Sequence, residues 1–531
     1  MASGAYDVVI VGGGIHGVCA AWEATRRGLR VALVEAEDFG HATTSNSLRT
    51  FHGGLRYLQQ MDFQRMRESI RERREWLRIA PDLVKPMRFV LPTSGHGMRG
   101  RTVMRTALLA NDLVSFDRND GVWVNRHLPR SEVWSTSRAL QVLAGTSIPN
   151  INGAATWHDA ICLNTERLHI ALVEATADAG AQVANYARAL KLRSDSDGVR
   201  GVQVRDELND REYDLRAPVV INAAGPWVDE WVTSNGGRKP RPVFTASKAF
   251  NLLARPLPFA DALGLPCSST YFAIPWNGRT LIGTRHLRCK PSTTTCDVTA
   301  EEVQAFLRDI NGALGKHRIA ESDVTGVFCG LLPEREGNRH GDVALVKTAR
   351  VTDHGVEDGL PGLYSIVGIK WTTSRAVAER AVKMACDRIC STASATPDRM
   401  LTLQTRGADA PAVRELIEQN PALGERVVAD LSIVKGQVVH AARSEMAVRL
   451  WDVVRRRVPL YLSDALDSGT LQACATLMAA ELGWTRFEAV RQLDDTLAQL
   501  AAFHGPLRRG PEEQTGHFRG SLTAGQRRLD A

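Results

Sequence analysis

The chain opens with Tyr6-Asp7-Val8-Val9-Ile10-Val11-Gly12-Gly13-Gly14-Ile15-His16-Gly17, an apolar strand that runs directly into a glycine-rich turn. A second apolar run, Val31-Ala32-Leu33-Val34, ends at the acidic residue Glu35. Strand, glycines, helix, second strand and terminal acid in this order predict a dinucleotide-binding βαβ unit. The unit places the chain among the α/β folds built on a parallel sheet.

Each residue of this unit has an expected task. Gly12 permits the tight turn, Gly14 lets the backbone approach a pyrophosphate, and Gly17 lets the helix pack closely on the strand. Gly13 belongs to the same cofactor-binding turn, and the helix N-terminus offers free N–H groups to the phosphates. Glu35 would accept hydrogen bonds from ribose hydroxyls, and an acid there disfavours a 2′-phosphate. These residues predict FAD or NAD as the cofactor.

The composition is that of an ordinary globular protein. The 531 residues are 44% hydrophobic and 24% charged, which is enough for two or three domains. No run of about 18 apolar residues predicts a transmembrane helix, and no segment resembles a secretory signal. The nine cysteines show no CxxC pair and no metal-ligand clustering. We therefore expect a reducing, cytoplasmic setting and no metal site.

The formal net charge is +7, and much of the excess lies between residues 65 and 130. A basic surface can attract anionic substrates, anionic lipid or nucleic acid. Glu68, Glu72 and Glu75 interleave with the arginines at helical spacing, which favours a solvated helix face with i,i+4 pairs. No basic array interleaved with aromatic residues indicates nucleic-acid binding. A peripheral contact with the inner face of a membrane stays open.

The apolar patterning divides the chain into four parts. Antiparallel strand-like segments interrupt the dinucleotide-binding domain and predict an inserted substrate cap. Helical periodicity takes over after about residue 395. The predicted parts are a Rossmann-like domain of residues 1–90, 151–235 and 325–394, a substrate-binding cap of residues 91–150 and 236–324, a C-terminal helical domain of residues 395–507, and a mobile tail of residues 508–531.

Three stretches carry a resemblance to a known family. Thr43-Thr-Ser-Asn-Ser-Leu-Arg-Thr-Phe-His-Gly-Gly-Leu-Arg-Tyr-Leu58 resembles the flavin-facing signature of FAD-dependent glycerol-3-phosphate dehydrogenases. Asn222-Ala-Ala-Gly-Pro-Trp-Val228 resembles that family's second FAD-contacting turn, and Gly368-Ile-Lys-Trp-Thr-Thr373 its third, at the flavin end. The likeness spans about residues 6–505. It implies a divergent member of the D-amino-acid-oxidase-like flavoproteins, with non-covalent FAD in the Rossmann-like domain.

The resemblance also implies a set of FAD contacts. Small residues such as Gly53, Gly54 and Gly225 permit close backbone approach to a flavin. Lys370 and the amide dipoles at the start of a helix could stabilise negative charge at the flavin N1/C2 carbonyl. His16, by contrast, is interpreted as a packing residue. The further expected contacts are Thr44, Ser45, Leu55, Ala189, Pro226, Trp227, Gly368, Ile369, Trp371 and Thr372.

The catalytic candidates are His52, Arg56, Tyr57, Lys370 and His286. A substrate over flavin N5 needs a base for its hydroxyl proton. Arg56 matches the family's substrate-side arginine and can hold an anionic group bidentately, with His52 and Tyr57 beside it. Structural alternatives stay open for each: His52 packed beside the cofactor, Arg56 in a local salt bridge, and Lys370 solvated at a helix start.

The substrate-site motifs depart from the family. Leu332 stands where the family has an arginine that grips phosphate, and the family's cap histidine falls near Phe250. His286, in Gly283-Thr284-Arg285-His286, is a candidate to replace the lost base. The candidates to replace the lost positive charge are Lys248, Arg285, Arg335 and Lys347.

Three functional hypotheses follow. The first is a dehydrogenase that passes hydride from a secondary alcohol, glycerol 3-phosphate or a related hydroxy compound, to flavin N5 and electrons to a quinone or another acceptor. The second is a flavin-dependent oxidase of an amine, amino acid or secondary-metabolite alcohol that uses oxygen. The third is a non-enzymatic, flavin-stabilised interaction module, against which the flavin-end motif around Lys370 argues. The sequence leaves a homodimer open.

Overall fold

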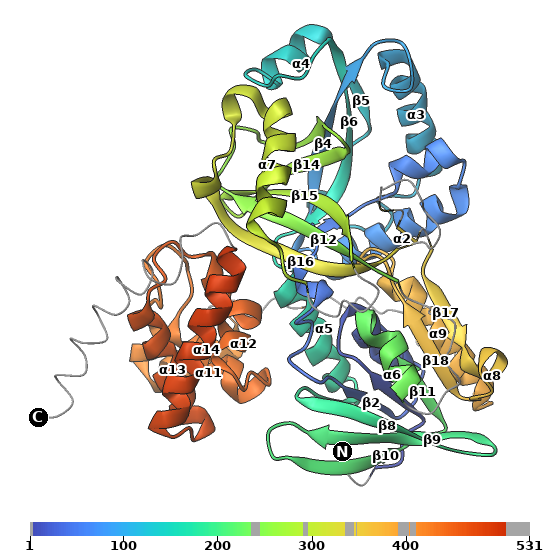
Figure 1. Ribbon diagram of the computed structural model, residues 1–531, viewed down its shortest axis with the longest axis vertical. Helices are drawn as coiled ribbons and strands as arrows, with labels where there is room; N and C mark the ends of the chain where they lie inside the picture. The colour runs from blue at the N-terminus through green and yellow to red at the C-terminus, as the bar shows by residue number, and fades with distance from the viewer. Residues whose placement is uncertain are drawn as a thin grey trace, which may run out of the picture.

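The computed structural model describes residues 4–234, 245–289, 296–334, 343, 345–346, 348–390, 403 and 410–505. The expected tail and two of the candidate cations, Arg335 and Lys347, lie outside the described residues. Figure 1 shows three bodies: a large sheet at the top, a smaller sheet below it, and the C-terminal helices to one side.

A six-stranded sheet contains the predicted βαβ unit. Its strand order is β17-β18-β11-β1-β2-β7, and all neighbours are parallel except β17 and β18. The strands are β1 (Val8–Val11), β2 (Val31–Val34), β7 (Gln182–Ala184), β11 (Val219–Asn222), β17 (Arg350–Asp353) and β18 (Leu363–Val367). The Rossmann-like prediction is confirmed.

Both faces of the six-stranded sheet are covered, which explains the continuous apolar runs of its strands. Val8 and Ile10 pack into the core beneath the helices, whereas Val9 and Val11 face a three-stranded antiparallel sheet. The covering helices are α1 (Ile15–Arg26), α5 (Thr165–Asp178) and α9 (Ser374–Arg388). The covering strands are β8 (Ala187–Asp195), β9 (Gly198–Asp206) and β10 (Arg211–Arg216).

The predicted cap is a nine-stranded, largely antiparallel sheet. Its order is β16-β12-β15-β14-β13-β4-β6-β3, and β5 also pairs with β6. The strands are β3 (Thr50–Phe51), β4 (Val84–Ser94), β5 (Glu132–Trp134), β6 (Ile151–Cys162), β12 (Thr245–Ala254), β13 (Ala262–Pro266), β14 (Thr270–Trp276), β15 (Arg279–Arg288) and β16 (Val324–Glu334).

This sheet takes in segments that we expected in the Rossmann-like domain. Strands β4, β6 and β16 pair within the large sheet, although residues 84–90, 151–162 and 325–334 were assigned to the cofactor domain. A strand's own apolar pattern does not say which sheet it joins, because its partners are distant in sequence. The predicted boundaries near residues 91 and 325 fall within β4 and β16, and the boundary near residue 151 falls at the start of β6. The domain division stays a prediction.

The remaining helices complete the cap and the C-terminal domain, and they confirm the predicted helical C-terminal part. The helices of the first two bodies are α2 (Phe63–Ile79), α3 (Arg101–Val114), α4 (Thr136–Val142), α6 (Val228–Ser234), α7 (Ala300–Leu314) and α8 (His354–Glu357). The C-terminal helices are α10 (Pro411–Gln419), α11 (Lys435–Ser444), α12 (Leu450–Asp452), α13 (Ser468–Leu482) and α14 (Arg486–His504).

A buried carboxylate, Asp38, joins the C-terminal domain to the Rossmann-like domain. The Arg457 guanidinium donates to both Asp38 oxygens, at 2.6 and 2.9 Å, and Arg456 makes a further short ion pair. Both arginines come from a π-helical turn, Val453–Arg457. Burial alone would raise the pKa of Asp38, but Arg457 and Arg456 hold it well below its usual range.

A second buried carboxylate, Glu166 on α5, also joins the Rossmann-like domain to the C-terminal domain. It pairs with Arg49 (Nη2 to Oε1, 2.8 Å) and with Arg455 of the same π-helical turn. Burial would raise the pKa of Glu166, but Arg49 and Arg455 hold it well below its usual range. Arg455 also donates to the carbonyl of Ser45 at 3.1 Å, so the C-terminal domain contacts the loop that resembles the flavin-facing signature.

A disulfide and the lengths of the helices bear on the compartment in which we expect the protein to work. Cys296 and Cys329 form a disulfide, with Cα atoms 5.8 Å apart, which the sequence did not predict. Disulfides are rare in reducing compartments, so the reducing setting stays a prediction. Among the helices in the described ranges, none is both long and apolar enough to cross a membrane.

We expect Asp38→Asn to weaken the attachment of the C-terminal domain. The change leaves Arg456 and Arg457 buried without their shared anion, and breaking a buried ion pair costs about 3–5 kcal/mol. Urea unfolding followed by circular dichroism measures the loss. Asp214→Asn, which breaks the exposed pair with Arg193, is the matched control and should cost less than about 1 kcal/mol. Equal losses in the two variants would contradict the assigned role of Asp38.

Candidate active site

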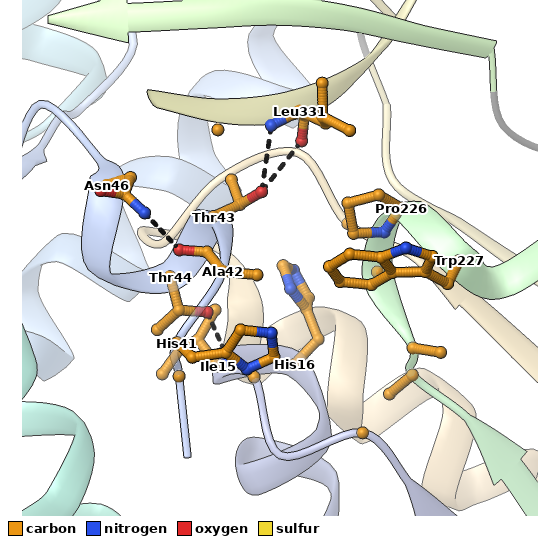
Figure 2. A pocket seen from close by; sticks show the side chains of 18 of the residues that line it. Ile15, His16, His41, Ala42, Thr43, Thr44, Asn46, Pro226, Trp227 and Leu331 are labelled. Carbon is orange, nitrogen blue, oxygen red and sulfur yellow. Dashed lines mark hydrogen bonds between the residues drawn. The ribbon is translucent and has the colours of Figure 1, made fainter. Parts of the chain in front are cut away.

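A cavity of about 820 Å³ lies between the carboxyl ends of β1, β2, β11 and β18 and the underside of the large sheet. Ligands of open α/β sheets bind at this edge. Figure 2 shows one part of it, where the start of α1, the loop of residues 41–46, and Pro226 and Trp227 face one another. The cavity brings together most of the residues that the sequence assigned to the cofactor.

The glycine turn has the predicted construction. Gly12 has φ of +102°, and a Cβ at Gly17 would lie 1.9 Å from the Gly12 carbonyl oxygen, so helix and strand pack too closely for any side chain. Gly12 and Gly14 line the cavity. Gly13 does not line it: its N–H donates to Glu35 Oε2 at 2.7 Å.

Glu35 directly follows β2 and also lines the cavity. Its carboxylate accepts the N–H groups of Gly13 and of Glu37, the latter at 2.9 Å. Part of its hydrogen-bonding capacity therefore holds the glycine turn in shape. A carboxylate has about four acceptor positions, so acceptor positions remain for ribose hydroxyls.

His16, which we interpreted as a packing residue, lies on the cavity wall. Its Nε2 is buried and has no hydrogen-bond partner among the described residues. The ring packs against Gly368, where an added Cβ would lie 2.0 Å from it. Burial lowers the pKa of His16 to about 4, so the imidazole is neutral at pH 7. A buried ring nitrogen without a protein partner is free to form a hydrogen bond with a bound cofactor.

The flavin-signature loop is attached on both sides of the cavity. Thr44 Oγ1 accepts the N–H of Ile15 at 3.1 Å, and Trp371 Nε1 donates to the Thr44 carbonyl at 2.9 Å. Thr43 Oγ1 donates to the carbonyl of Leu331 at 3.1 Å and accepts its N–H at 3.2 Å. Ser45 instead points away from the cavity and donates to the carbonyl of Gly40. The sequence reasoning missed Thr43, whose role depends on β16.

The second predicted turn lines the cavity near the end of β11. Gly225 has φ of +58°, and a Cβ there would meet no atom within 4 Å, so its open side faces empty space. Trp227 stacks with His41 at a centroid distance of 6.0 Å. Pro226 and Ala189 complete this wall. All four predicted residues of this region, Ala189, Gly225, Pro226 and Trp227, therefore border the cavity.

The opposite end of the cavity gathers three of the catalytic candidates. His52 and Lys370 line it, and Lys370 Nζ lies 4.4 Å from the centroid of the Tyr57 ring. The rings of His52 and Tyr57 are 6.3 Å apart. Burial lowers the pKa of Lys370 to about 8. Burial, together with the nearby Lys370 charge, lowers the pKa of His52 to about 4.

The other two candidates, Arg56 and His286, lie just outside the cavity lining. Burial and the charge of Arg56 lower the pKa of His286 to about 4, and Arg56 acts in the same direction on His52. The exposed Arg56 thus lies close to both histidines. His286 is the cross-strand partner of Ala249, which lines the cavity.

The predicted contacts Gly53, Gly54 and Leu55 shape this end without lining the cavity. The Gly53 N–H donates to Asp159 Oδ1 at 2.6 Å. Gly54, with φ of +81°, packs against the Tyr57 ring at the start of a 3₁₀ turn, Leu55–Gln60. Leu55 packs into the core beneath the large sheet. Gly368, Ile369, Trp371 and Thr372, which we expect to contact FAD, all line the cavity.

The part of the cavity roof that the structure describes is uncharged. It is formed by Ala249, Asn251, Thr284, Gly330 and Leu332 from three neighbouring cap strands. Thr284 Oγ1 donates to Asn251 Oδ1 at 2.8 Å. Leu332 therefore does border the space that we assigned to the substrate.

Phe250, in contrast, does not mark the substrate pocket as we expected. Strand alternation turns it to the other face of the sheet, where it is fully buried against Phe306 at a centroid distance of 5.6 Å. Its neighbour Asn251 faces the cavity instead.

Two of the candidate replacement cations also face away. Lys248 pairs with Glu302 of α7 at 2.8 Å, and Arg285 pairs with Asp309 of the same helix at 3.3 Å. Neither is therefore placed to compensate for the arginine that Leu332 replaces.

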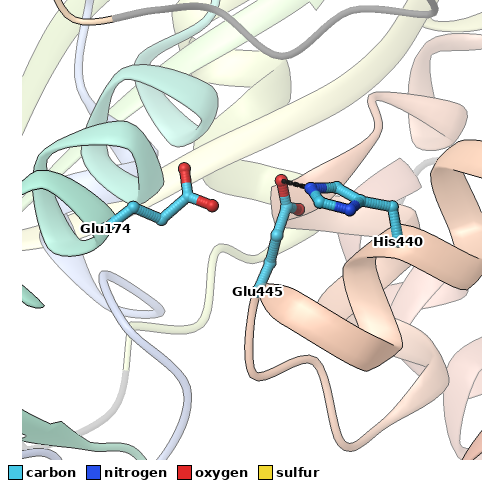
Figure 3. A group of neighbouring side chains, drawn as sticks. All are labelled: Glu174, His440 and Glu445. Carbon is cyan, nitrogen blue, oxygen red and sulfur yellow. Dashed lines mark ion pairs between the residues drawn. The ribbon is translucent and has the colours of Figure 1, made fainter. Parts of the chain in front are cut away.

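A separate buried cluster, Glu174, His440 and Glu445, lies between α5 and α11 (Figure 3). Its ligand atoms fall within 4.8 Å of one another, as a metal site would require. Arg167 donates to Glu445 at 2.7 Å and to Glu174 at 2.9 Å. This guanidinium already supplies the positive charge that the two carboxylates need, so the cluster is explained as an ion-pair contact between domains.

The residues present fit FAD. The glycine turn leaves room for a pyrophosphate at the start of α1, Glu35 has acceptors for a ribose, and His16 has a buried nitrogen without a partner. Lys370 at the other end offers a positive charge beside the strand-to-helix turn of residues 368–373.

Comparison with known proteins agrees with this geometry. Residues 7–384 match the family described as FAD dependent oxidoreductase, and residues 366–489 match the C-terminal domain of alpha-glycerophosphate oxidase. A glycerol-3-phosphate dehydrogenase of Synechocystis is 29% identical over 92% of this chain and 95% of its own length. The human mitochondrial glycerol-3-phosphate dehydrogenase is 26% identical over 92% of this chain and 72% of its own length.

Solved structures show the same fold. The glycerol-3-phosphate dehydrogenase from Bacillus halodurans, complexed with FAD, has a TM-score of 0.73 at 21% identity and covers 96% of this chain and 97% of its own. L-alpha-glycerophosphate oxidase from Mycoplasma pneumoniae has a TM-score of 0.55 at 14% identity, over 75% of this chain and 98% of its own. The chain therefore belongs to the FAD-dependent oxidoreductase family, as a glycerol-3-phosphate dehydrogenase-like member that uses FAD.

Proposed function

We propose that this chain oxidises a secondary alcohol, with glycerol 3-phosphate or a related hydroxy compound as its substrate. The observation that carries the proposal is the gathering of His52, Tyr57 and Lys370 at one end of the cavity, with Arg56 close by. The names of the relatives support the same substrate class. FAD, when bound, supplies the acceptor for the hydride at N5.

The roles of the side chains follow from their charges. Arg56 is exposed and carries a guanidinium that can hold a phosphate or carboxylate through two parallel hydrogen bonds. His52 is neutral at pH 7, because its pKa is lowered to about 4, so a ring nitrogen can accept the hydroxyl proton. His286 is neutral for the same reason and is the alternative base. Lys370 is positive below about pH 8 and can offset negative charge on the reduced cofactor.

The uncharged roof favours a second candidate. Asn251, Thr284 and Leu332 offer hydrogen bonds and apolar contact but no positive charge to a phosphate. A flavin-dependent oxidase of an amine, amino acid or secondary-metabolite alcohol, using oxygen, would suit such a roof. Arg56 favours an anionic substrate over an uncharged alcohol or a simple amine, because these have no anionic group for its guanidinium to bind.

We further propose the partners and setting of the reaction. A quinone is the proposed electron acceptor, with oxygen or another acceptor as the alternative. The protein would work in the cytoplasm with a peripheral contact at the inner face of a membrane, where a lipid-soluble acceptor is available. A homodimer is compatible with this arrangement.

We expect glycerol 3-phosphate to bleach the flavin absorbance of the holoenzyme under anaerobic conditions, and glycerol and amino acids to fail. Arg56→Ala should raise the KM for glycerol 3-phosphate, because loss of a charged bidentate contact costs on the order of 1.5–3 kcal/mol, or about 10- to 100-fold. Arg193→Ala on β8 is the control. Bleaching by an amino acid or amine alone would favour the oxidase.

We expect the loss of the Lys370 charge to lower the rate of flavin reduction at high pH. Its amine is charged below its pKa of about 8 and neutral above it, so the rate of flavin reduction should fall as pH rises through that value. Lys370→Arg keeps the charge and should move this limb upward, and Lys370→Met should remove it and slow reduction at every pH. Stopped-flow reduction measures the profiles. A rate that rises through pH 8 and loses that rise in Lys370→Arg would instead make Lys370 the base.

His16 should contribute to cofactor affinity. Replacing its unpartnered ring in His16→Leu removes a hydrogen bond of about 1 kcal/mol and should weaken FAD binding by about fivefold to tenfold. His16→Asn keeps a hydrogen-bonding side chain and should bind more tightly than His16→Leu. Quenching of flavin fluorescence during reconstitution of the apoprotein measures both, with His96→Leu, in an exposed loop, as the control. Equal FAD affinities of the parent, His16→Leu and His16→Asn would show that His16 only packs and does not bind the cofactor.

A further inference from the structure

Two buried polar side chains lie side by side in the otherwise apolar strands of the six-stranded sheet. Asn222 is the last residue of β11, and it lies in register with Ser365 of β18. Both side chains are fully buried. Burying a polar side chain costs stability unless it is hydrogen-bonded. The hydrogen bonds of this pair therefore indicate what it does.

The Asn222 amide holds the second turn of the cavity wall at both of its ends. Its Oδ1 accepts the N–H of Ala224 at 3.2 Å, and its Nδ2 donates to the carbonyl of Val228 at 3.0 Å. Residues 225–227, between these two contacts, all line the cavity, and Figure 2 shows two of them on its wall. One buried amide therefore sets the shape of this part of the wall.

A chain of further side chains fixes the position of the amide. Asn222 Nδ2 also donates to Ser365 Oγ at 3.2 Å, and Ser365 Oγ lies 2.7 Å from His354 Nε2. On the other side of the imidazole, Nδ1 makes a short hydrogen bond with the Asp358 carboxylate. We call Asp358, His354, Ser365 and Asn222 the α8 relay, because His354 begins α8 and Asp358 directly follows it. Figure 1 shows α8 beside β18, on the side of the molecule away from the C-terminal helices.

The carboxylate at the outer end gives the hydrogen bonds of the α8 relay one direction. An ionised carboxylate only accepts, so Nδ1 of His354 carries the hydrogen and Nε2 of the neutral ring accepts. The Ser365 hydroxyl therefore donates to the ring, and its oxygen accepts from Asn222 Nδ2. This leaves Asn222 Oδ1 as the acceptor for the Ala224 N–H, so the relay continues into the backbone of the turn.

Asp358, His354 and Ser365 have the hydrogen-bond order of a nucleophilic triad, but their burial excludes such a reaction. Ser365 is 0% exposed and His354 is 1% exposed, and neither lines the cavity. A substrate cannot reach the hydroxyl. The Asp358 side chain, in contrast, is 11% exposed. The relay thus runs from the surface beside α8 to the cavity wall, and its hydrogen bonds are available for positioning.

We infer that the α8 relay positions the turn of residues 223–228 for FAD. The three outer members, Asp358, His354 and Ser365, are positioning residues, because they act on the cofactor through the amide and do not line the cavity. Binding groups need such support from behind, since small displacements of them cost affinity. The inference depends on the use of FAD and not on the proposed substrate.

The affinity of the full-length holoenzyme for FAD tests the inference. Ser365→Ala removes the hydroxyl from the relay, and Asp358→Ala removes the acceptor at its outer end. We expect each change to weaken FAD binding by about fivefold, which corresponds to the loss of one hydrogen bond. Asp358→Asn keeps an acceptor oxygen for Nδ1 and should restore most of the affinity. The increase in fluorescence as FAD leaves the diluted holoenzyme measures the dissociation constants.

Two comparisons make the test specific to the relay. Glu357→Ala is the matched control, because Glu357 lies on α8 and pairs with Arg350 at the surface. This control should bind FAD like the parent. The double variant Asp358→Ala/Ser365→Ala should bind FAD about as weakly as the weaker single variant, because both changes interrupt the same chain of hydrogen bonds.

Urea unfolding of the same variants distinguishes positioning from a role in stability alone. Relay variants that are less stable but bind FAD like the parent would overturn the inference. Fold-changes that multiply in the double variant, or an Asp358→Asn that binds no better than Asp358→Ala, would also overturn it. These measurements need no substrate, so failure of the proposed reaction and failure of this inference are observed separately.

Discussion

Two buried carboxylates, Asp38 and Glu166, hold the molecule together. Asp38 pairs with Arg456 and Arg457 of one π-helical turn in the C-terminal domain. Glu166 pairs with Arg455 of the same turn and with Arg49 of the flavin-signature loop. Buried charges are tolerated only when they are paired and hydrogen-bonded. The pairing therefore fixes the C-terminal helices against the Rossmann-like domain, and through Arg455 and Ser45 it fixes one wall of the cavity.

This attachment helps to hold the loop of residues 43–46 in a position where it contacts both the Rossmann-like domain and the cap. Thr44 is tied to the start of α1, and Thr43 is tied to β16 of the cap. The loop forms a single 3₁₀ turn, Thr43–Asn46, and these side-chain contacts and Arg455 hold that turn in position. A cofactor site built from a loop needs such support, because small displacements of the binding groups cost affinity and rate.

The sequence alone was enough to single out many residues that the structure places around one cavity. Gly12, Gly14, Glu35, Gly225 and the residues of 368–372 line the cavity because each belongs to a short turn between a strand and a helix, whose geometry is set locally. The sequence predicted less of the structure where contacts between residues far apart in the chain determine it. The partners Asp38 and Arg457 are 419 residues apart in the chain, and no local pattern joins them.

Register explains the error at Phe250. Successive side chains of a strand point to opposite faces, and Ala249 and Asn251 line the cavity whereas Phe250 between them is buried on the other face. Asn251 therefore reaches the cavity where an alignment of motifs placed Phe250. The same alternation directs Lys248 to α7. Among the described residues, Lys248 and Arg285 face α7 and not the roof, and Arg56 and Lys370 are the positive charges near the catalytic end of the cavity.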